Sequence, residues 1–327
     1  MSTTIRWGIL ATGKIARQFA ADLALVPDAR LVAVGSRSLE SAERFAAAYD
    51  GEGPVRAHGS YADLVDDPDV DVVYVATPHA LHLDDARLAL EAGKHVLCEK
   101  PLTLDARDAE RLFALASERG LFLMEAMWTA CHPAIHALRE RLATGELGRP
   151  RHLHAELGFV VPDDPTSRML DSRLGAGALL DMGIYPLTFA HLLLGEAHSL
   201  TAEADVVRTE HGDYDASIVI AGRYPAGVLA TMAASMTSVS SRSATIATDT
   251  GRIVVADFHH PTRIVFTPLD GAAIEIEPAT PVIGRGYSHE IVEVGRCLRA
   301  GLTESPLVPP VQTLAILRQM DALRATV

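Results

Sequence analysis

Cysteine and clustered positive charge are scarce in this chain, and each shortage excludes a class of protein. The three cysteines, Cys98, Cys131 and Cys297, are odd in number and widely spaced, which predicts reduced thiols instead of a disulfide framework. Arginine and lysine never gather in groups of more than two or three, and the net charge is -13. Nucleic acid is therefore not an expected partner, because phosphate binding needs a basic surface.

Long apolar runs are lacking as well. No run approaches the roughly 18 residues that a membrane-spanning helix needs, and residues 1–6 contain no basic stretch followed by an apolar one. We therefore expect a cytoplasmic protein that does not contact a membrane. Metal ligands are also scarce: His132 and His136 are spaced to share a helix face, but no carboxylate or cysteine completes a set, so no metal is expected.

The 327 residues are enough for two domains, and strands alternate with helices in the first of them. Such strand–helix units predict an α/β domain of the Rossmann type, with a doubly wound parallel sheet, which we place at residues 1–126. Ligands of these sheets bind at the carboxyl ends of the strands. The apolar runs that predict its strands are residues 5–10, 31–35, 71–76, 95–98 and 121–124.

The turn after the first predicted strand matches a dinucleotide-binding motif. In residues 11–16, ATGKIA, Ala11 replaces the first glycine of G-x-G-x-x-G/A, Gly13 is the second and Ala16 takes the small third position. The helix that begins there points free amides at a pyrophosphate, so we assign Gly13, Lys14 and Ile15 to the cofactor site. A glycine at a strand–helix turn that binds no cofactor is the alternative.

The second predicted strand ends in Ser36 and Arg37 where many such domains have an acidic residue. An acid would bind a ribose 2′-hydroxyl and repel a 2′-phosphate, whereas arginine and serine both donate to that phosphate. The sequence therefore favours NADP over NAD as the cofactor. An ordinary surface arginine after a strand is the alternative.

Polar residues follow two more strands at the same predicted edge. Pro101 keeps the residue before it extended, so the ammonium group of Lys100 is presented on a stiff segment. A histidine that packs or caps structurally is an equally good interpretation of His79 and His82. The residues that we expect at the cofactor from this edge are Thr77, His79, His82, Glu99 and Lys100.

From residue 151 onward strands predominate, and several alternate polar with apolar residues. This pattern predicts an α+β domain with an open, largely antiparallel sheet, which we place at residues 127–327. Within it residues 175–194 read as a helix, on which Asp181 and Tyr185 share a face. If that face meets the cofactor edge, Tyr185 and Lys100 form a general acid/base pair; a buried tyrosine with a satisfied hydroxyl is the alternative.

Four segments in this order resemble one family. Residues 8–16, 77–82, 99–101 and 181–185 together look like the glucose-fructose oxidoreductase and inositol dehydrogenase family, Gfo/Idh/MocA, over essentially the whole chain. Residues 121–129, together with the tyrosine at 185, are most similar to the branch that holds dimeric dihydrodiol dehydrogenase and NADP-dependent D-xylose dehydrogenase.

The resemblance implies a substrate site between a cofactor domain and a second domain, where Lys100 faces the nicotinamide. Tyr185 stands where much of the family has histidine, which makes it the proton-transfer residue, and Trp128 resembles a wall of the substrate pocket. A homodimer or dimer of dimers is also implied. Ala11 and His79 depart from the commoner glycine and asparagine, so the details of pyrophosphate and ribose contact stay open.

We therefore predict an NADP-dependent dehydrogenase or reductase that transfers hydride between the nicotinamide and a secondary alcohol or carbonyl of a sugar-like or cyclic diol substrate. Lys100, Tyr185 and Asp181 are the predicted catalytic residues, and Trp128 and Arg168 are predicted to contact the substrate. Two alternatives of the same fold are a dinucleotide-sensing regulator and a redox-assisted glycoside hydrolase, which regenerates its cofactor in each cycle.

Overall fold

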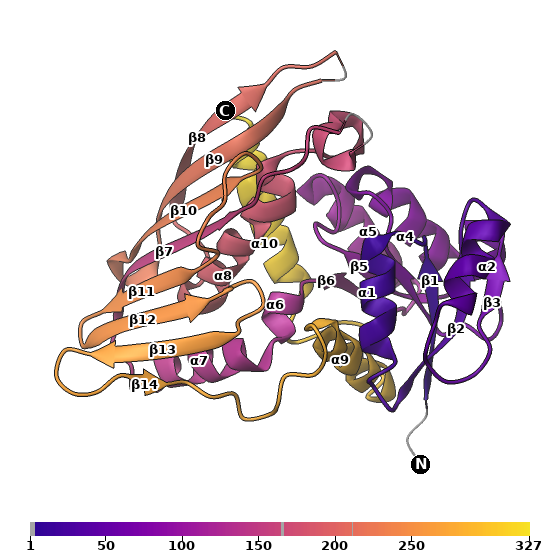
Figure 1. The fold of residues 1–327 in the computed structure, drawn as a ribbon, viewed down its shortest axis with the longest axis horizontal. Helices are drawn as coiled ribbons and strands as arrows, with labels where there is room; N and C mark the ends of the chain where they lie inside the picture. The colour runs from indigo at the N-terminus through magenta and orange to yellow at the C-terminus, as the bar shows by residue number, and fades with distance from the viewer. Residues whose placement is uncertain (1–3, 165–166, 211) are drawn as a thin grey trace. The chain divides into compact units, whose positions relative to one another are not determined.

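The structure is a computed structural model that describes residues 4–164, 167–210 and 212–327 (Figure 1). The contacts within the chain divide it into two units, which are described separately below. Unit 1 comprises Met1–Trp128 and Val282–Leu314, and unit 2 comprises Thr129–Pro281 and Ala315–Val327. These units differ from the predicted domains, 1–126 and 127–327, mainly because the chain returns to unit 1 at residue 282.

Unit 1 contains a parallel sheet of six strands in the order β3-β2-β1-β4-β5-β6. The central strands are buried because helices cover both faces of such a sheet. This arrangement confirms the predicted doubly wound α/β fold and adds the short strand β3, which the apolar pattern does not reveal. The strands are β1 (Ile5–Leu10), β2 (Ala29–Gly35), β3 (Arg56–His58), β4 (Val72–Val75), β5 (His95–Glu99) and β6 (Leu123–Ala126).

The helices of unit 1 begin where their sequences supply caps. Ser38, Ser60 and Asp105 each accept a hydrogen bond from the amide three residues later, which satisfies a donor in the first turn. In space α1 packs beside α9, and α4 packs beside α5 (Figure 1). The helices are α1 (Lys14–Leu23), α2 (Leu39–Ala47), α3 (Tyr61–Val65), α4 (His82–Glu91), α5 (Ala106–Glu118) and α9 (Tyr287–Arg299).

A buried carboxylate on α1 explains why the segment after residue 282 joins unit 1. Asp22 accepts hydrogen bonds from the amides of Arg285, Gly286 and Ser288 at 2.9, 3.1 and 3.2 Å. Gly286 is the N-cap of α9 and has no side chain, so Asp22 supplies the cap from 264 residues away in sequence. The negative charge of Asp22 also lies at the positive end of the α9 dipole.

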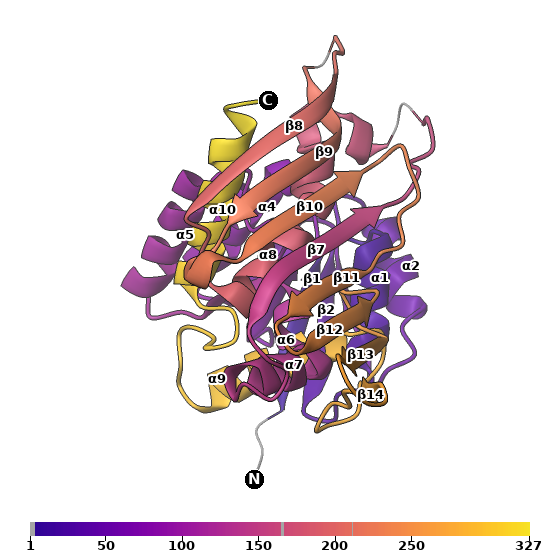
Figure 2. The same ribbon diagram turned by 90° about the vertical axis from the view of Figure 1, so that its left-hand side faces the viewer.

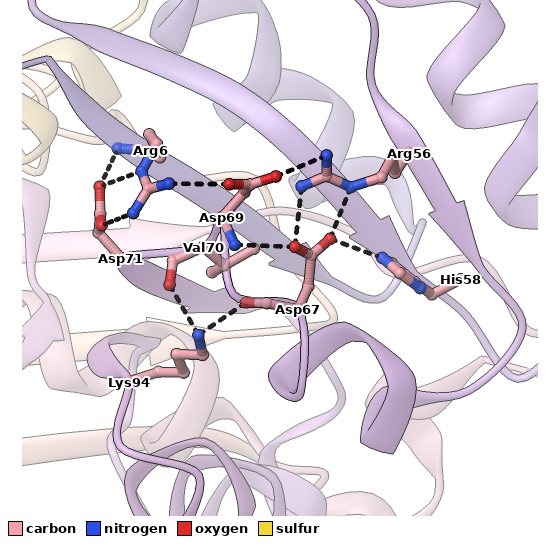
Figure 3. Close-up of polar contacts among 8 residues, drawn as sticks. All are labelled: Arg6, Arg56, His58, Asp67, Asp69, Val70, Asp71 and Lys94. Atoms are coloured by element: carbon pink, nitrogen blue, oxygen red, sulfur yellow. Dashed lines mark hydrogen bonds and ion pairs between the residues drawn. The ribbon is translucent and has the colours of Figure 1, made fainter.

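A cluster of ion pairs joins three strands of unit 1 (Figure 3). At its centre is Asp67, in the loop before β4, which accepts two hydrogen bonds of 2.8 Å from Arg56 of β3. His58 and the amide of Asp69 bind the same carboxylate at 3.0 and 2.9 Å. Burial acts to raise the pKa of Asp67, but these hydrogen bonds outweigh it and lower the pKa to about 2.

The other members of the cluster hold the neighbouring strands. Arg6 of β1 donates to Asp71, which directly precedes β4, at 3.0 Å from its Nε and 2.6 Å from its Nη2. Lys94, just before β5, donates to the carbonyl oxygens of Asp67 and Val70 at 2.7 and 2.9 Å. These contacts lie where β1, β4 and β5 begin, so they stabilise the edge of the sheet opposite the predicted cofactor edge.

Unit 2 is built on a sheet of eight strands in the order β14-β13-β12-β11-β7-β10-β9-β8 (Figure 2). All neighbours are antiparallel except β7 and β10, which confirms the predicted, largely antiparallel sheet. The strands are β7 (Pro150–Gly158), β8 (Ser199–Val207), β9 (Tyr214–Arg223), β10 (Leu229–Ser235), β11 (Ala244–Thr248), β12 (Gly251–Ala256), β13 (Arg263–Pro268) and β14 (Ile274–Glu275).

One face of this sheet is covered by helices and the other is open. On β10, Ala230, Met232 and Ala234 are buried against η4 and α8, while Leu229 and Thr231 are exposed on the opposite face. Figure 2 looks onto the open face, with α8 behind the strands. The helical elements are α6 (Trp128–Cys131), α7 (Pro133–Ala143), η4 (Leu179–Gly183), α8 (Ile184–Leu194) and α10 (Pro310–Arg324), which crosses from unit 1 into unit 2.

The covering helix is apolar enough to resemble a membrane span. Residues Ser172–Leu194 have the length and hydropathy of such a segment, whereas the sequence is predicted to contain none. In the structure 83% of the most apolar part of this segment is buried. Burial of this degree is typical of a core helix. Nearby, His132 caps the start of α7 by accepting the Ala134 amide at 3.3 Å, and His136 lies 2.7 Å from the Ala130 carbonyl oxygen, so both histidines have structural contacts.

Candidate functional site

The turn after β1 leaves a helix N-terminus open at the carboxyl edge of the sheet of unit 1. Gly13 is the N-cap of α1, with no side-chain cap among the described residues, and a Cβ at this position would meet nothing within 4 Å. The backbone at Gly13 has a φ of -71°, so its own conformation does not require glycine. Ala11, in place of the first glycine of the motif, instead has a φ of 88°, a region that L-residues rarely adopt.

This open turn fits a dinucleotide. Strain of this kind is concentrated at functional sites, and uncapped amides at a helix N-terminus bind phosphate groups. Lys14 and Ile15 form the first positions of α1, as predicted, and Lys14 is exposed. The observation that supports the assignment is that a Cβ at Gly13 would meet no side chain within 4 Å, so no side chain crowds the backbone that a pyrophosphate would approach.

Ser36 and Arg37 follow β2, the strand beside β1. Ser36 is buried and accepts the amide of Ser38 at 3.3 Å, whereas Arg37 is exposed. Burial raises the pKa of Asp85, and the positive charge of Arg37 acts in the opposite direction. Arg37, which is predicted to favour NADP over NAD, therefore follows β2 at the predicted edge and is exposed.

His82 links the two loops that bear the other predicted cofactor residues. Its ring nitrogens lie 2.8 Å from the Pro101 carbonyl oxygen and 2.9 Å from the Thr77 carbonyl oxygen. His82 is completely buried, and the ring of the buried His79 packs edge-on against it at 5.6 Å between centroids. These contacts give His82 the structural role that the sequence leaves open. Its contact with a cofactor stays a prediction.

Glu99 and Lys100 end β5, two strands from β1. The carboxylate of Glu99 is buried, accepts a short hydrogen bond from the Tyr74 hydroxyl and accepts the amide of Lys100 at 3.2 Å. The Lys100–Pro101 peptide bond is cis, and Lys100 is half-buried. Glu99 thus anchors the backbone of Lys100 to the core, a contact that the sequence does not reveal, and its contact with the cofactor stays a prediction.

Trp128 stands at the end of unit 1, directly after β6. Its indole packs on the ring of Tyr287 at 4.8 Å between centroids, and it lies close to Gly286, at the start of α9. The predicted pocket residue is therefore held by the segment that returns to unit 1. This contact orients the indole, and its role toward substrate stays a prediction.

Asp181 and Tyr185 lie in unit 2 at the start of the covering helix. Residues Leu179–Gly183 form a π-helical turn, η4, that continues into α8, so the helix is not the regular one that the sequence predicts. Such turns are frequent at functional sites. Asp181 accepts a hydrogen bond of 3.2 Å from Arg168, and both Asp181 and Tyr185 are at least nine-tenths buried. The structure thus brings together Arg168 and Asp181, two of the predicted site residues.

Two residues near the predicted ones were not anticipated. The ring of His259 packs edge-on against Tyr185 at 5.5 Å between centroids, and its carbonyl oxygen accepts the Thr129 hydroxyl at 2.5 Å. In unit 1, Glu290 of α9 is completely buried, and neither of its oxygens has a hydrogen-bond partner among the described residues. Burial, followed by the charges of Glu99 and Asp22, raises the pKa of Glu290 well above its usual value. Only the burial pattern of α9 would have revealed Glu290, since the acid falls on the apolar face of that helix.

In each unit the predicted residues come together separately. In unit 1 the carboxyl ends of β2, β1, β4 and β5, which are consecutive in the sheet, carry the residues predicted to hold the cofactor. In unit 2 a buried helix start carries the carboxylate of Asp181 and the phenol of Tyr185, and the ring of His259, from the segment after β12, packs against that phenol. The first set consists of free amides at a helix N-terminus and an ammonium group, and the second of a carboxylate and a phenol.

Comparison with known families matches both parts of the chain. Residues 5–127 match a family described as "Oxidoreductase family, NAD-binding Rossmann fold", and residues 135–254 match the "GFO/IDH/MocA C-terminal domain". The mouse protein named trans-1,2-dihydrobenzene-1,2-diol dehydrogenase is 34% identical, over 99% of this chain and 97% of its own length. D-xylose 1-dehydrogenase (NADP(+)) of Hypocrea jecorina is 35% identical, over 98% of this chain and 92% of its own length.

A solved structure is also similar to this chain over nearly its whole length. A 3-ketoreductase from Actinomadura kijaniata, in complex with NADP and TDP-benzene, is 30% identical and has a TM-score of 0.87, covering 99% of this chain and 98% of its own. Two of these three proteins carry NADP in their names or descriptions, which is the cofactor predicted from Ser36 and Arg37.

Proposed function

Because this chain belongs to the Gfo/Idh/MocA family of NAD(P)-dependent oxidoreductases that act on CH–OH groups, we propose that it transfers hydride between NADP and a secondary alcohol or carbonyl of a neutral, sugar-like or cyclic diol substrate. The observation that carries this proposal is the position of Lys100. It lies at the carboxyl end of β5, on the sheet edge where Gly13 leaves the N-terminus of α1 open. An ammonium group beside a bound dinucleotide is placed to act on a substrate oxygen.

NADP is the proposed cofactor, and its nicotinamide supplies the hydride chemistry when bound. The amides of residues 13–15 hold the pyrophosphate at the N-terminus of α1. Arg37 and Ser36 bind the 2′-phosphate, for which the planar guanidinium group offers two parallel donors. Thr77, His79 and Glu99 shape the edge around it, the last by anchoring the backbone of Lys100.

Tyr185 is the proposed general acid/base. A free tyrosine has a pKa near 10, too high for a base at neutral pH. An ammonium group about 4 Å from the phenol is worth roughly 4 kcal/mol at an effective dielectric near 20, which is about three pKa units. Lys100 would therefore bring Tyr185 into the range where general acid/base catalysis works best. In oxidation Tyr185 takes the proton of the substrate hydroxyl while Lys100 donates a hydrogen bond to the oxygen of that hydroxyl. In reduction Tyr185 returns the proton.

Asp181 and Arg168 are proposed to orient the substrate. Arg168 donates to Oδ1 of Asp181, so the carboxylate is held in place to accept a hydrogen bond from a hydroxyl beside the reacting carbon. Trp128, held on Tyr287, provides an apolar wall that suits a sugar face or an aromatic ring. A neutral diol or aldose fits this set better than a phosphorylated sugar, because Arg168 is already paired.

Substitution of the two proposed acid/base groups tests the function. We expect Tyr185→Phe and Lys100→Met each to lower kcat at least about a hundredfold, the usual contribution of proton transfer, with NADPH absorbance followed on a panel of aldoses and diols. Tyr224→Phe is the matched control for the tyrosine, since the buried Tyr224 hydroxyl has no partner among the described residues. Lys94→Met removes the same charge from the opposite edge of unit 1.

The outcome of this assay separates the alternatives. Wild-type turnover in both Tyr185→Phe and Lys100→Met would overturn the assigned roles. Binding of NADP without turnover on any substrate would favour a dinucleotide-sensing regulator. Substrate cleavage with no net NADPH formation, and with cofactor retained through purification, would favour a redox-assisted glycoside hydrolase.

The proposal extends to assembly in the cytoplasm as a homodimer or dimer of dimers. It is supported by the open face of the sheet of unit 2, where the side chains of Val219 and Leu229 are 58% and 43% exposed on neighbouring strands. Burial of such a face against a second copy removes apolar surface from water. Light scattering after size exclusion should give a multiple of the 35.0 kDa chain, and a monomeric mass would contradict this part of the proposal.

A further inference from the structure

Asp215 of β9 lies beneath the start of the helix that carries Asp181 and Tyr185. Its Oδ2 accepts the amide N–H of Leu179 at 2.6 Å, across 36 residues of sequence. Gly177 packs so closely on the same carboxylate that a Cβ at this position would collide with Oδ1. The helix begins at Ala178, which offers no side-chain cap among the described residues, so Asp215 takes the place of the missing N-cap from another element.

The turn held in this way controls the direction of the two side chains. Residues 179–183 form a π-helical turn, in which one extra residue is accommodated relative to an α-helix. Each α-helical residue rotates the chain by about 100°. Relaxation of the π turn to regular α-helix would therefore rotate Tyr185, which follows the turn, against the residues before the turn by up to about that angle, and would also redirect Asp181 within it.

We propose that Asp215 is a positioning residue, whose carboxylate holds the π-helical turn in the register that presents Asp181 and Tyr185 to the substrate. This inference rests on the proposed function of Tyr185. Asp215 acts through the Leu179 amide and has no contact with substrate in this role. The neighbouring Gly177, with a φ of 122°, allows the chain to pass over the carboxylate into the helix.

The electrostatics of Asp215 make this role depend on pH. Burial raises the pKa of Asp215 to about 6, while the Leu179 amide and the charge of Arg324, on the part of α10 in unit 2, act in the opposite direction. At neutral pH the group is therefore mainly ionised, and its charge interacts with the positive end of the helix. Protonation below about pH 6 leaves a neutral acceptor, which binds the amide more weakly.

Asp215→Asn and Asp215→Ala test the inference, with Asp205→Asn as matched control, since Asp205 is an exposed acid on the neighbouring strand β8. Asparagine imitates the protonated acid. We expect kcat of Asp215→Asn to be about tenfold below wild type near pH 8 and equal to wild type near pH 5, as a charge at a helix terminus accounts for about that factor. Asp215→Ala should be lower at every pH, and Asp205→Asn should follow wild type.

Hydrogen exchange tests the hydrogen bond between Asp215 and the Leu179 amide without reference to activity. The peptide that contains the Leu179 amide should exchange about tenfold faster in Asp215→Ala than in wild type or Asp205→Asn, because the cap has been lost. If Asp215→Ala does not fold, the ratio of kcat in wild type to kcat in Asp215→Asn, measured as a function of pH, still tests the inference. A ratio that does not change with pH, or unchanged exchange in Asp215→Ala, would overturn the inference.

The two proposals can fail independently. Wild-type turnover in Tyr185→Phe would refute the proposed role of Tyr185 as general acid/base. It would leave the exchange experiment valid as a test of the hydrogen bond between Asp215 and the Leu179 amide. A Tyr185→Phe enzyme without activity, combined with an Asp215→Asn enzyme that matches wild type from about pH 5 to 8, would leave the function in place and refute the role of Asp215.

Discussion

Asp67 offers the sharpest test of the interactions that hold unit 1 together. Asp67 is only 6% exposed. Its carboxylate accepts hydrogen bonds from two nitrogens of the Arg56 guanidinium group and from the Asp69 amide, and it also contacts His58 (Figure 3). Asp67→Asn keeps the shape of the side chain and removes the charge. The amide group also places a donor where Arg56 donates, so at least one of the paired hydrogen bonds is lost.

The expected cost follows from the shift in pKa. Asp67 titrates at 3.8 as its ordinary value and at about 2 in the folded protein, a difference of about two units. At 1.36 kcal/mol per unit the ionised form is stabilised by between about 2 and 3 kcal/mol in the fold. We therefore expect Asp67→Asn to lower the free energy of unfolding of unit 1 by about that amount near neutral pH.

The dependence on pH has a definite sign. The folded pKa of Asp67 lies below the unfolded one, so its contribution is fully present above about pH 4 and is lost as the pH falls from about 4 to about 2. Asp67→Asn lacks this titration. The difference in unfolding free energy between wild type and Asp67→Asn should therefore be constant from about pH 7 to 5 and should shrink below pH 4.

Urea denaturation followed by circular dichroism measures both effects, with Asp69→Asn as the control. Asp69 also pairs with Arg56, and with Arg6 in addition, but its side chain is 53% exposed, and exposed ion pairs contribute at most about 1 kcal/mol. Equal destabilisation by Asp67→Asn and Asp69→Asn would refute the argument from burial. A difference from wild type that persists at pH 2 would refute the argument from pKa.

Two further predictions concern the cofactor edge and the core of unit 1. Arg37→Ala should weaken the binding of NADP by about 10- to 100-fold, because a charge-assisted pair with the 2′-phosphate is lost, and should leave NAD binding unchanged; a fluorescence titration with both cofactors measures this, and an equal loss for NAD would contradict it. Glu290→Gln should change the unfolding free energy by less than about 1 kcal/mol at neutral pH, because burial raises the pKa of Glu290 well above its usual value and so favours the neutral form, which glutamine imitates. Glu290→Ala should cost at least about 2 kcal/mol through the cavity that it leaves. A large loss in Glu290→Gln, measured by the same denaturation, would show that the buried acid is ionised.

Local patterns in the sequence were enough to predict most of the fold. Apolar runs with helical stretches between them identified the parallel sheet of unit 1, and alternation identified the sheet of unit 2. Short strands without an apolar run could not be predicted in this way. An example is β3, whose residues Arg56–His58 lie at the sheet edge and pair only with β2. The π-helical turn also escaped it, since its residues keep an apolar spacing close to that of an α-helix.

Side chains that bridge distant segments could not be predicted in the same way. Asp22 caps α9 over 264 residues and Asp215 caps the Tyr185 helix over 36, and both are ordinary acids in sequence. Glu99 and His82 are predicted cofactor residues because of their place at strand ends, and the sequence does not reveal that the carboxylate also binds Tyr74 and the ring also contacts two carbonyl oxygens. A residue's position along a strand fixes which edge it occupies, and the packing around it decides where its side chain points.

The sequence by itself determined the family, the fold class and the edge of unit 1 at which Gly13, Arg37 and Lys100 lie, because these depend on periodicity and on short motifs within one strand–helix unit. Only the tertiary structure decided which acids are caps, which are paired and which are buried and neutral. Those properties depend on the dielectric and on the donors around each carboxylate, and both are set by segments that are far apart in sequence and meet only when the chain has folded.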